Sequence, residues 1–219
     1  LLSRRQRQMC IRDREDEGAD IVGVSAALPG VDEAGALCGL VEELEGMVSL
    51  PLWINAHDPA ALEAGLRGYA GKPLVGPVDG TAGRLEATLP LVRKYGCGMV
   101  VAMPDEGGTS ATAEERVRVV ERVIAAAEQA GVSRCDIVVD CSALLGAGDS
   151  AEAEVVRALS LCRLLGVRTM LSVPAEGSGV FPNADDASAF LAAALDAGLD
   201  LPVFDARSER YREVVEASE

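Results

Sequence analysis

Residues 99–140 contain one complete unit of the repeat that decides the fold. The apolar run MVVAM at 99–103 is followed by TAEERVRVVERVIAAAEQAG at 112–131 and then by a second apolar run, DIVVD, at 136–140. The two outer runs are short and almost without polar alternation, which is typical of parallel strands covered on both faces. The middle run has apolar residues at helical spacing. This order predicts a strand, a helix and a second, parallel strand.

The same unit recurs along the chain. Seven strand-and-helix units fit the alternation, and the predicted strands are Ile21–Ser25, Leu52–Asn55, Leu74–Gly76, Met99–Met103, Ile137–Asp140, Thr169–Val173 and Pro202–Asp205. The alternation of strands and helices predicts a parallel α/β fold. A doubly wound nucleotide-binding sheet usually has G-x-G-x-x-G after its first strand, and none of these strands is followed by it. We therefore expect a (β/α)8 TIM barrel with about seven strands present.

Helix ends are also readable. Thr112 and Glu115 have the spacing of a capping box, and Gly131 is expected to end that helix. Asp58 followed by Pro59 predicts the start of another helix. A third helix is predicted by the apolar stripe Leu37, Leu40, Val41 and Leu44.

Residues 1–14 differ from everything that follows. They carry five of the 20 basic residues and one of the 35 acidic ones. The run QMCIRD at 8–13 looks like a translated sequencing adapter, so we interpret 1–14 as an artefact and 15–219 as one barrel domain. The first strand of the barrel would then lie upstream of this sequence. The alternative is that residues 1–14 are a basic amphipathic leader or helix.

Bulk properties exclude several classes of function. The net charge is −15, which repels a phosphate backbone, so nucleic acid is not an expected partner. Six cysteines are scattered without C-x-x-C pairs and no secretory signal precedes them, which indicates free thiols in the cytoplasm. No apolar run reaches the roughly 18 residues of a membrane span. His57 is the single histidine, so we expect no bound metal.

Polar residues gather where the predicted strands end. In TIM barrels the active site lies at the carboxyl-terminal ends of the strands. The residues at or just after these ends are Ser25, Asn55, Gly76, Asp79, Asp105, Asp140 and Asp205. Carboxylate and amide groups there are suited to a heterocycle rich in N–H donors. The alternative for each acid is that it only caps the next helix.

Five stretches together resemble a known family. They are LPLWINAHDPAALEAGL at 50–66, KPLVGPVDG at 72–80, RLEATLPLVRKYGCGMVVAMPDEG at 84–107, DIVVD at 136–140 and FLAAALDAGLD at 190–200. Their order and spacing resemble the methyltetrahydrofolate:corrinoid methyltransferases over about residues 15–206. That family shares its pterin-binding barrel with dihydropteroate synthases and with the folate module of cobalamin-dependent methionine synthase. The resemblance implies a methylated folate as substrate, cobalamin on a corrinoid partner protein, and a methyl group passed from N5 to cobalt. A homodimer is compatible with it.

The sequence departs from the family at several site positions. Family members typically end the strand matching 52–55 in D-S, the next in I-N-S, the one matching 137–140 in I-D-P, and the one after in G-L-S-N. Of these groups only Asp140 is kept, whereas Asn55, Gly76 and Ala175 replace an acid and two amides. The early D-V-N-like run reads Gly23-Val24-Ser25. Asp79, Asp105 and Asn183 are further polar groups that could bind the substrate.

The replacements have different physical consequences. Asp140 can accept two hydrogen bonds from the 2-amino and N3 groups of a pterin. Asn55 is the expected catalytic residue, but it carries no charge near N5. Charged hydrogen bonds contribute about 1.5 to 3 kcal/mol against about 1 for neutral ones. Two hypotheses follow: a divergent methyltransferase, or a binding or assembly subunit that has lost catalysis.

Overall fold

A seven-stranded parallel sheet forms the centre of the computed structural model, which describes residues 13–103, 112–146, 151–175, 180–181 and 183–218. The strands are β1 (Val22–Ser25), β2 (Leu52–Asn55), β3 (Leu74–Val78), β4 (Gly98–Ala102), β5 (Ile137–Asp140), β6 (Arg168–Ser172) and β7 (Leu201–Val203). They lie in the order β1-β2-β3-β4-β5-β6-β7. Each strand therefore pairs with the next one in the sequence.

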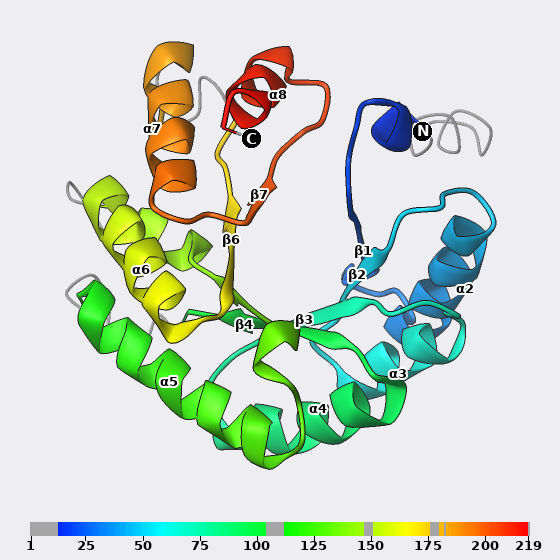
Figure 1. Cartoon of the computed structure of the whole chain (residues 1–219). Coiled ribbons are helices and arrows are strands. Elements are labelled where there is room, and N and C mark those ends of the chain that lie inside the picture. Colours follow the sequence, from blue (N-terminus) through cyan, green and yellow to red (C-terminus); the bar gives the residue numbers. More distant parts are fainter. Residues whose placement is uncertain (1–12, 104–111, 147–150, 176–179, 182, 219) are drawn as a thin grey trace.

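Helices follow the strands and cover the outer face of the curled sheet (Figure 1). They are α2 (Glu33–Glu45), α3 (Pro59–Arg67), α4 (Ala82–Tyr95), α5 (Ala113–Gln129), α6 (Ala151–Leu165), α7 (Ala184–Asp196) and α8 (Glu209–Glu216). Two short 3-10 helices, η1 (Arg134–Asp136) and η2 (Ser142–Gly146), flank β5. The curled sheet and sequential order confirm the predicted α/β barrel with seven strands and exclude a doubly wound sheet, whose strand order reverses.

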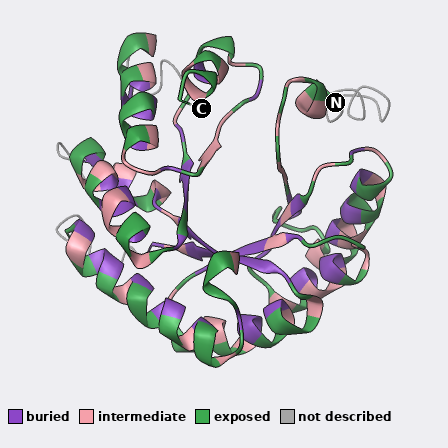
Figure 2. Cartoon of the chain, viewed as in Figure 1, coloured by how far each residue is buried: buried purple, intermediate pink, exposed green. Residues whose placement is uncertain are grey.

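The central strands β4 and β5 bury both of their faces, as their unbroken apolar character predicts (Figure 2). Side chains such as Val101, Val139 and Leu171 face the helices and join the main core. The alternate side chains face the inside of the barrel, where Val100, Val138 and Met170 form a smaller cluster packed by Trp53 and other strand residues. Because side chains alternate along a strand, this cluster identifies which strand-end residues face the mouth.

The predicted helix ends are confirmed where the side chains make the expected bonds. Asp58 accepts from the Ala60 N–H at 3.2 Å, and Thr112 and Glu115 form a complete capping box at the start of α5. Leu40 differs from the prediction because it is 38% exposed. The other three residues of that stripe are buried. Leu40 thus lies at the margin of the buried face of α2.

Strand ends differ from the prediction by one or two residues at several places. Two strands differ by two residues at their ends: β3 was predicted to end at Gly76 but runs to Val78, and β7 was predicted to run to Asp205 but ends at Val203. Asp205 turns the chain instead, since its carbonyl accepts from the Ser208 N–H at 2.8 Å. Its carboxylate forms ion pairs with Arg14 and Arg207, which hold its pKa well below the usual range. The bonds of Asp205 are therefore made to Arg14 and within the turn at 205–208, and not to the other candidate residues of the barrel mouth.

Candidate active site at the barrel mouth

The inner faces of the strands end in a ring of small and polar residues. Ser25 and Asn55 are registered neighbours on β1 and β2, and Ala102 is the registered neighbour of Asp140 on β4 and β5. Each lies two residues after an inward-facing position, so it points toward the same side of its strand. The structure therefore brings Ser25, Asn55 and Asp140 to the mouth of one barrel.

Asp140 is half-buried and held in a defined orientation. Its Oδ1 accepts from the Ser142 backbone N–H at 2.9 Å and from the Ser142 hydroxyl. Ser142 Oγ in turn accepts from the Ser172 N–H at 2.8 Å, at the end of β6. Within the described ranges, no hydrogen bond reaches Oδ2 of Asp140. Ser142 thus fixes one carboxylate oxygen of Asp140, and the other has no bond to the described residues.

Sequence reasoning missed Ser142 and Ser172. Ser142 follows Asp140 by two residues, which is the spacing of a turn closed by an aspartate side chain, and this signal could have identified it. Ser172 carries no comparable local signal, because its contact with Ser142 spans 30 residues. Together these serines connect the ends of β5 and β6 beside the candidate acid.

Gly76 occupies its position because the backbone requires glycine. Its φ is +119°, a conformation that L side chains rarely adopt, and a Cβ there would lie 2.6 Å from the Val100 carbonyl oxygen. Its own carbonyl accepts from the Trp53 indole N–H at 3.1 Å. Gly76 thus contributes backbone but no side chain, and a side chain could not be added without moving β4.

The other predicted site residues lie beyond the strand ends or are bonded in the turns and helix starts that follow the strands. Asp79 accepts from the Thr81 N–H at 3.0 Å, and Asn183 accepts from the Asp186 N–H at 2.8 Å, so both side chains are used at the starts of α4 and α7. Ala175 is exposed beyond the end of β6. Asp105 lies outside the described residues. Asn183 is the N-cap of α7, whereas the bond of Asp79 closes a turn ahead of α4, whose N-cap is Thr81.

A sequence profile of the family described as pterin binding enzyme matches residues 9–200. The match covers most of the chain. This chain belongs to the pterin-binding enzymes.

The relatives of this pterin-binding enzyme include two methionine synthases. The one from Mycobacterium leprae is 26% identical over 211 residues, which is 88% of this chain and 18% of that protein. The one from Mycobacterium tuberculosis is 28% identical over 125 residues, which is 53% of this chain and 10% of that protein. The chain therefore spans less than a fifth of the length of these relatives.

A solved structure of a dihydropteroate synthase from Clostridium difficile, obtained in the presence of pteroic acid, has the same fold. Its TM-score is 0.75 at 18% identity, with 96% of this chain and 85% of that chain covered. At this identity the likeness concerns the fold alone. It agrees with the barrel architecture seen here.

Two buried thiols lie behind the candidate acid of this pterin-binding enzyme. Cys141 and Cys162 are fully buried. The pKa of Cys141 is raised well above its usual value, first by a hydrogen bond with Cys162 and then by burial. Burial also raises the pKa of Cys97 to about 11. The described cysteines are free thiols, and the raised pKa values of Cys97 and Cys141 keep these two thiols protonated at neutral pH.

Neither a metal centre nor a membrane span is present in the described part of this chain. No group of three or more histidine, cysteine, aspartate or glutamate side chains there could hold a metal ion. No helix among these residues combines the length and the apolar character needed to cross a bilayer. His57, the single histidine of the sequence, is exposed in the loop after β2.

Proposed function

We propose that this chain binds a methylated reduced pterin of the methyltetrahydrofolate class at the barrel mouth and donates its methyl group to a corrinoid carried by a partner protein. The observation that carries the proposal is the inward-facing carboxylate of Asp140, with Oδ2 unbonded within the described ranges. The two methionine synthase relatives favour methyl transfer among the activities found on this fold.

Asp140 suits the pyrimidine ring of a pterin because that ring presents its 2-amino group and N3–H side by side. A carboxylate accepts such a pair of donors with good geometry. Oδ1 already accepts two bonds from Ser142, so we propose Oδ2, which has two lone pairs and no bond to the described residues, as the acceptor for the ring donors. Since Ser142 and Ser172 hold the carboxylate, little orientational freedom is lost when the ligand binds.

The transfer step breaks the bond from N5 to the methyl carbon and forms a bond from that carbon to cobalt. The methyl group leaves without the electron pair of the broken bond, which stays on N5, while the reduced corrinoid supplies the electron pair of the new bond. N5 therefore has to take up a proton before or during the step, and the protonated N5 carries a positive charge until the bond to the methyl carbon breaks. An anionic group near N5 would stabilise that charge. Asn55, the catalytic residue we propose, can offer only its amide dipole. We therefore expect slow transfer.

Calorimetric titration with methyltetrahydrofolate tests the proposal. The parent chain is expected to bind, and Asp140→Asn is expected to weaken binding by about 2 to 4 kcal/mol, because a partner of charged hydrogen bonds is lost. Asp136→Asn is a matched control, since Asp136 lies just before the opposite end of β5 and pairs with Lys72 at 2.6 Å. Equal affinities in both variants, or no binding by the parent, would contradict the proposal.

A second candidate is a pterin-binding barrel that no longer catalyses transfer. The backbone of Gly76 favours it, because the polar side chain that the resemblance expects at this place cannot be accommodated there. Binding of methyltetrahydrofolate without any transfer to cob(I)alamin in a single turnover would identify this second function. Measurable transfer would exclude it.

A further inference from the structure

The inner face of β6 ends in a serine whose hydroxyl is directed into the barrel mouth. Met170 belongs to the cluster inside the barrel, whereas Leu171 joins the core under the helices. Because side chains alternate along a strand, Ser172 faces the inside like Met170. Ser172 is exposed, and its hydroxyl makes no hydrogen bond to the residues that the structure describes. The candidate site therefore contains a polar group that its bonds to Asp140 do not use.

The backbone of Ser172 is fixed beside Asp140. Asp140 and Met170 are registered neighbours on β5 and β6. Two residues further along both chains, the Ser172 N–H donates to Ser142 Oγ at 2.8 Å, and the Ser142 hydroxyl donates to Asp140 Oδ1. One oxygen atom thus bonds both the carboxylate of Asp140 and the main chain of Ser172. The side chain of Ser172 consequently lies next to this carboxylate, on the side of Oδ1.

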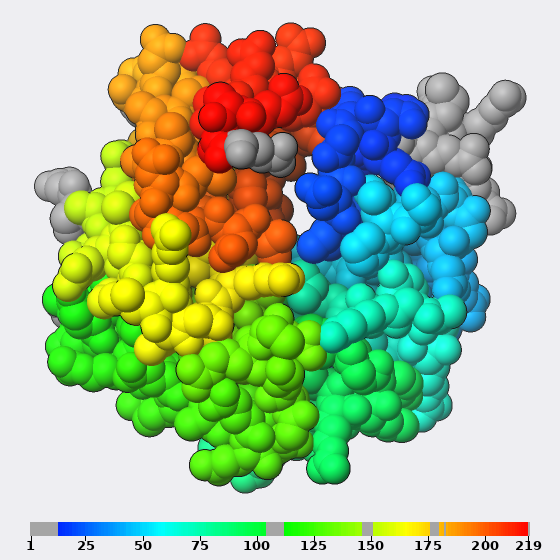
Figure 3. Space-filling view, viewed as in Figure 1, coloured from blue at the N-terminus to red at the C-terminus, as the bar shows by residue number. Residues whose placement is uncertain are grey.

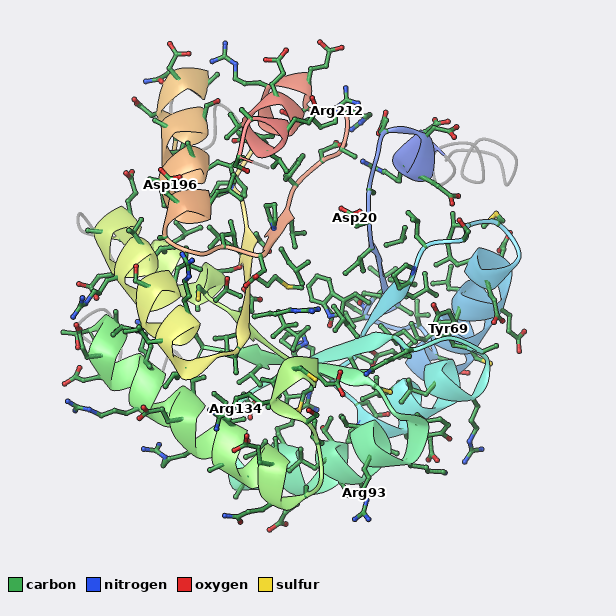
Figure 4. The ribbon with its side chains drawn as sticks, viewed as in Figure 1. Asp20, Tyr69, Arg93, Arg134, Asp196 and Arg212 are labelled. Atoms are coloured by element: carbon green, nitrogen blue, oxygen red, sulfur yellow. The ribbon has the colours of Figure 1, made fainter. Side chains whose placement is uncertain are left out.

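The inside of the barrel is apolar on the amino-terminal side of Ser172. Met170 and Trp53 line a cavity of about 580 Å³ between β1 and β7. Figure 3 shows its opening between the N-terminal residues in blue and the C-terminal residues in orange and red. Asp20 and Arg212 also line the cavity, and Figure 4 labels them on the two sides of this opening. The polar edge of a ring therefore finds bonding groups at the strand ends, and not among the apolar residues beneath them.

The edge of a pterin ring presents two donors followed by an acceptor. The donors are the 2-amino group and N3–H, and the acceptor is the 4-oxo oxygen next to N3. An ionised carboxylate only accepts hydrogen bonds, so Asp140 can bond the two donors but not the oxygen. A serine hydroxyl can donate. A carboxylate and a neighbouring hydroxyl together therefore match the order of groups on this edge.

We propose that Ser172 is a specificity-determining residue, whose hydroxyl donates to the 4-oxo oxygen of the ring that Asp140 holds. The inference rests on the proposed function, because Asp140 must first bond the two ring donors. The main chain and the side chain of Ser172 then have separate tasks. Its N–H holds Ser142, and its hydroxyl bonds the ligand. In the G-L-S-N run of the similar family, matched so that Ala175 takes the place of asparagine, this position is glycine.

Calorimetric titration with two ligands tests the inference. 6-Methylpterin has no methyl group on N5, so its binding is measured without transfer. Its 4-thioxo analogue keeps the 2-amino and N3–H donors but presents sulfur, which is a weak acceptor. Ser172→Ala is expected to lower the affinity for 6-methylpterin about fivefold, which corresponds to one neutral hydrogen bond. The affinity of this variant for the analogue should stay within about twofold of the parent value, because little bonding to sulfur is lost.

Three further variants separate the hydroxyl from structural effects. Ser172→Thr keeps the hydroxyl and should keep the preference for 6-methylpterin. Ser142→Ala releases the carboxylate of Asp140 and should weaken the binding of both ligands by the same factor. Ser160→Ala is a matched control, because the Ser160 hydroxyl donates to the Val156 carbonyl at 3.0 Å within α6. It should change neither affinity.

The possible results distinguish this inference from the proposed function. No loss in Ser172→Ala, or an equal loss for both ligands, would overturn the inference while the pterin site itself would stand. A parent chain that binds neither ligand would overturn both. The expected selectivity in a chain that does not transfer methyl groups to cob(I)alamin would support the role of Ser172 and contradict only the transfer step.

Discussion

Asn55 has an amide NH2 group where an aspartate would have a carboxylate oxygen, so it lacks one negative charge. It ends β2 next to Ser25, and no ion pair in the described structure involves it. An aspartate at this position would fill the same volume as Asn55 and would need no change in the backbone. The missing charge can therefore be restored without disturbing the fold.

Asn55→Asp is expected to raise the rate of methyl transfer from methyltetrahydrofolate to cob(I)alamin in single-turnover assays. A gain of about 1 to 2 kcal/mol in the transition state corresponds to roughly 5- to 30-fold in rate. Adding Ala175→Asn tests the second replaced position, where the residue is exposed and has room to change. A parent chain as fast as the double variant would show that the pocket uses other groups.

Gly76 cannot be restored in the same way. Because a Cβ at this position lies 2.6 Å from the Val100 carbonyl oxygen and φ is +119°, an asparagine there would strain the backbone of β3. The replacement of an amide by glycine is thus a change of backbone as well as of side chain. This backbone change is the reason why a comparison of residue types alone underestimates how far the site differs from that of the family.

Helices α2 and α3 both begin after an aspartate, but only one aspartate caps its helix. Asp58 bonds the Ala60 N–H, whereas Asp32 makes no side-chain cap bond. Asp58→Ala is therefore expected to lower the free energy of unfolding by about 1 kcal/mol and Asp32→Ala by much less. Thermal unfolding of the two variants beside the parent measures this difference, and equal losses would contradict it.

Helices α3 and α4 are joined by Glu63. Its carboxylate accepts from Lys94 at 2.7 Å and pairs with Arg67 at 3.3 Å, and these bonds lower its pKa from 4.5 to about 2. A depressed carboxyl pKa stabilises the folded state above pH 4.5, and this contribution is lost as the pH falls toward 2. Glu63→Gln is therefore expected to lower the Tm at pH 7 but not near pH 2.

A second glutamate provides the control for this pH dependence. Glu86 is an exposed residue of α4 and makes no ion pair within the described residues. Glu86→Gln should change the Tm by the same small amount at every pH. If the Tm difference between Glu63→Gln and the parent persists at pH 2, the bond to Lys94 does not lower the pKa of Glu63 as expected. High salt should also reduce the effect of Glu63→Gln, because the pair is exposed.

Among the described residues, β1 and β7 each pair with one strand only, so we expect the backbone of the sheet to be protected unequally from hydrogen exchange. The residues of β4 and β5 are bonded on both sides, whereas β1 and β7 end the strand order. Hydrogen exchange of the parent chain should therefore be slowest at Val100 and Val138 and at least roughly tenfold faster at Gly23 and Ser25. Uniform protection across the seven strands would contradict this and would indicate that the edges are already covered.

The sequence by itself determined the class of the fold and the order of its parts. Apolar runs such as MVVAM at 99–103, and the local signals at Thr112 and Asp58, depend on neighbours within a few residues. Such short-range signals depend little on how the rest of the chain folds. The barrel, its seven strands and the starts of α3 and α5 were therefore predictable, as was the choice of Asp140 as a strand-end residue.

Only the tertiary structure decided which strand-end side chains face one another and which groups are already bonded. The bond of Ser172 to Ser142 spans 30 residues, and the contact that excludes a side chain at Gly76 comes from β4. The cavity at Trp53 arises between strands at the two ends of the sheet. These features depend on distances between segments that are remote in sequence, and a local pattern carries no information about such distances.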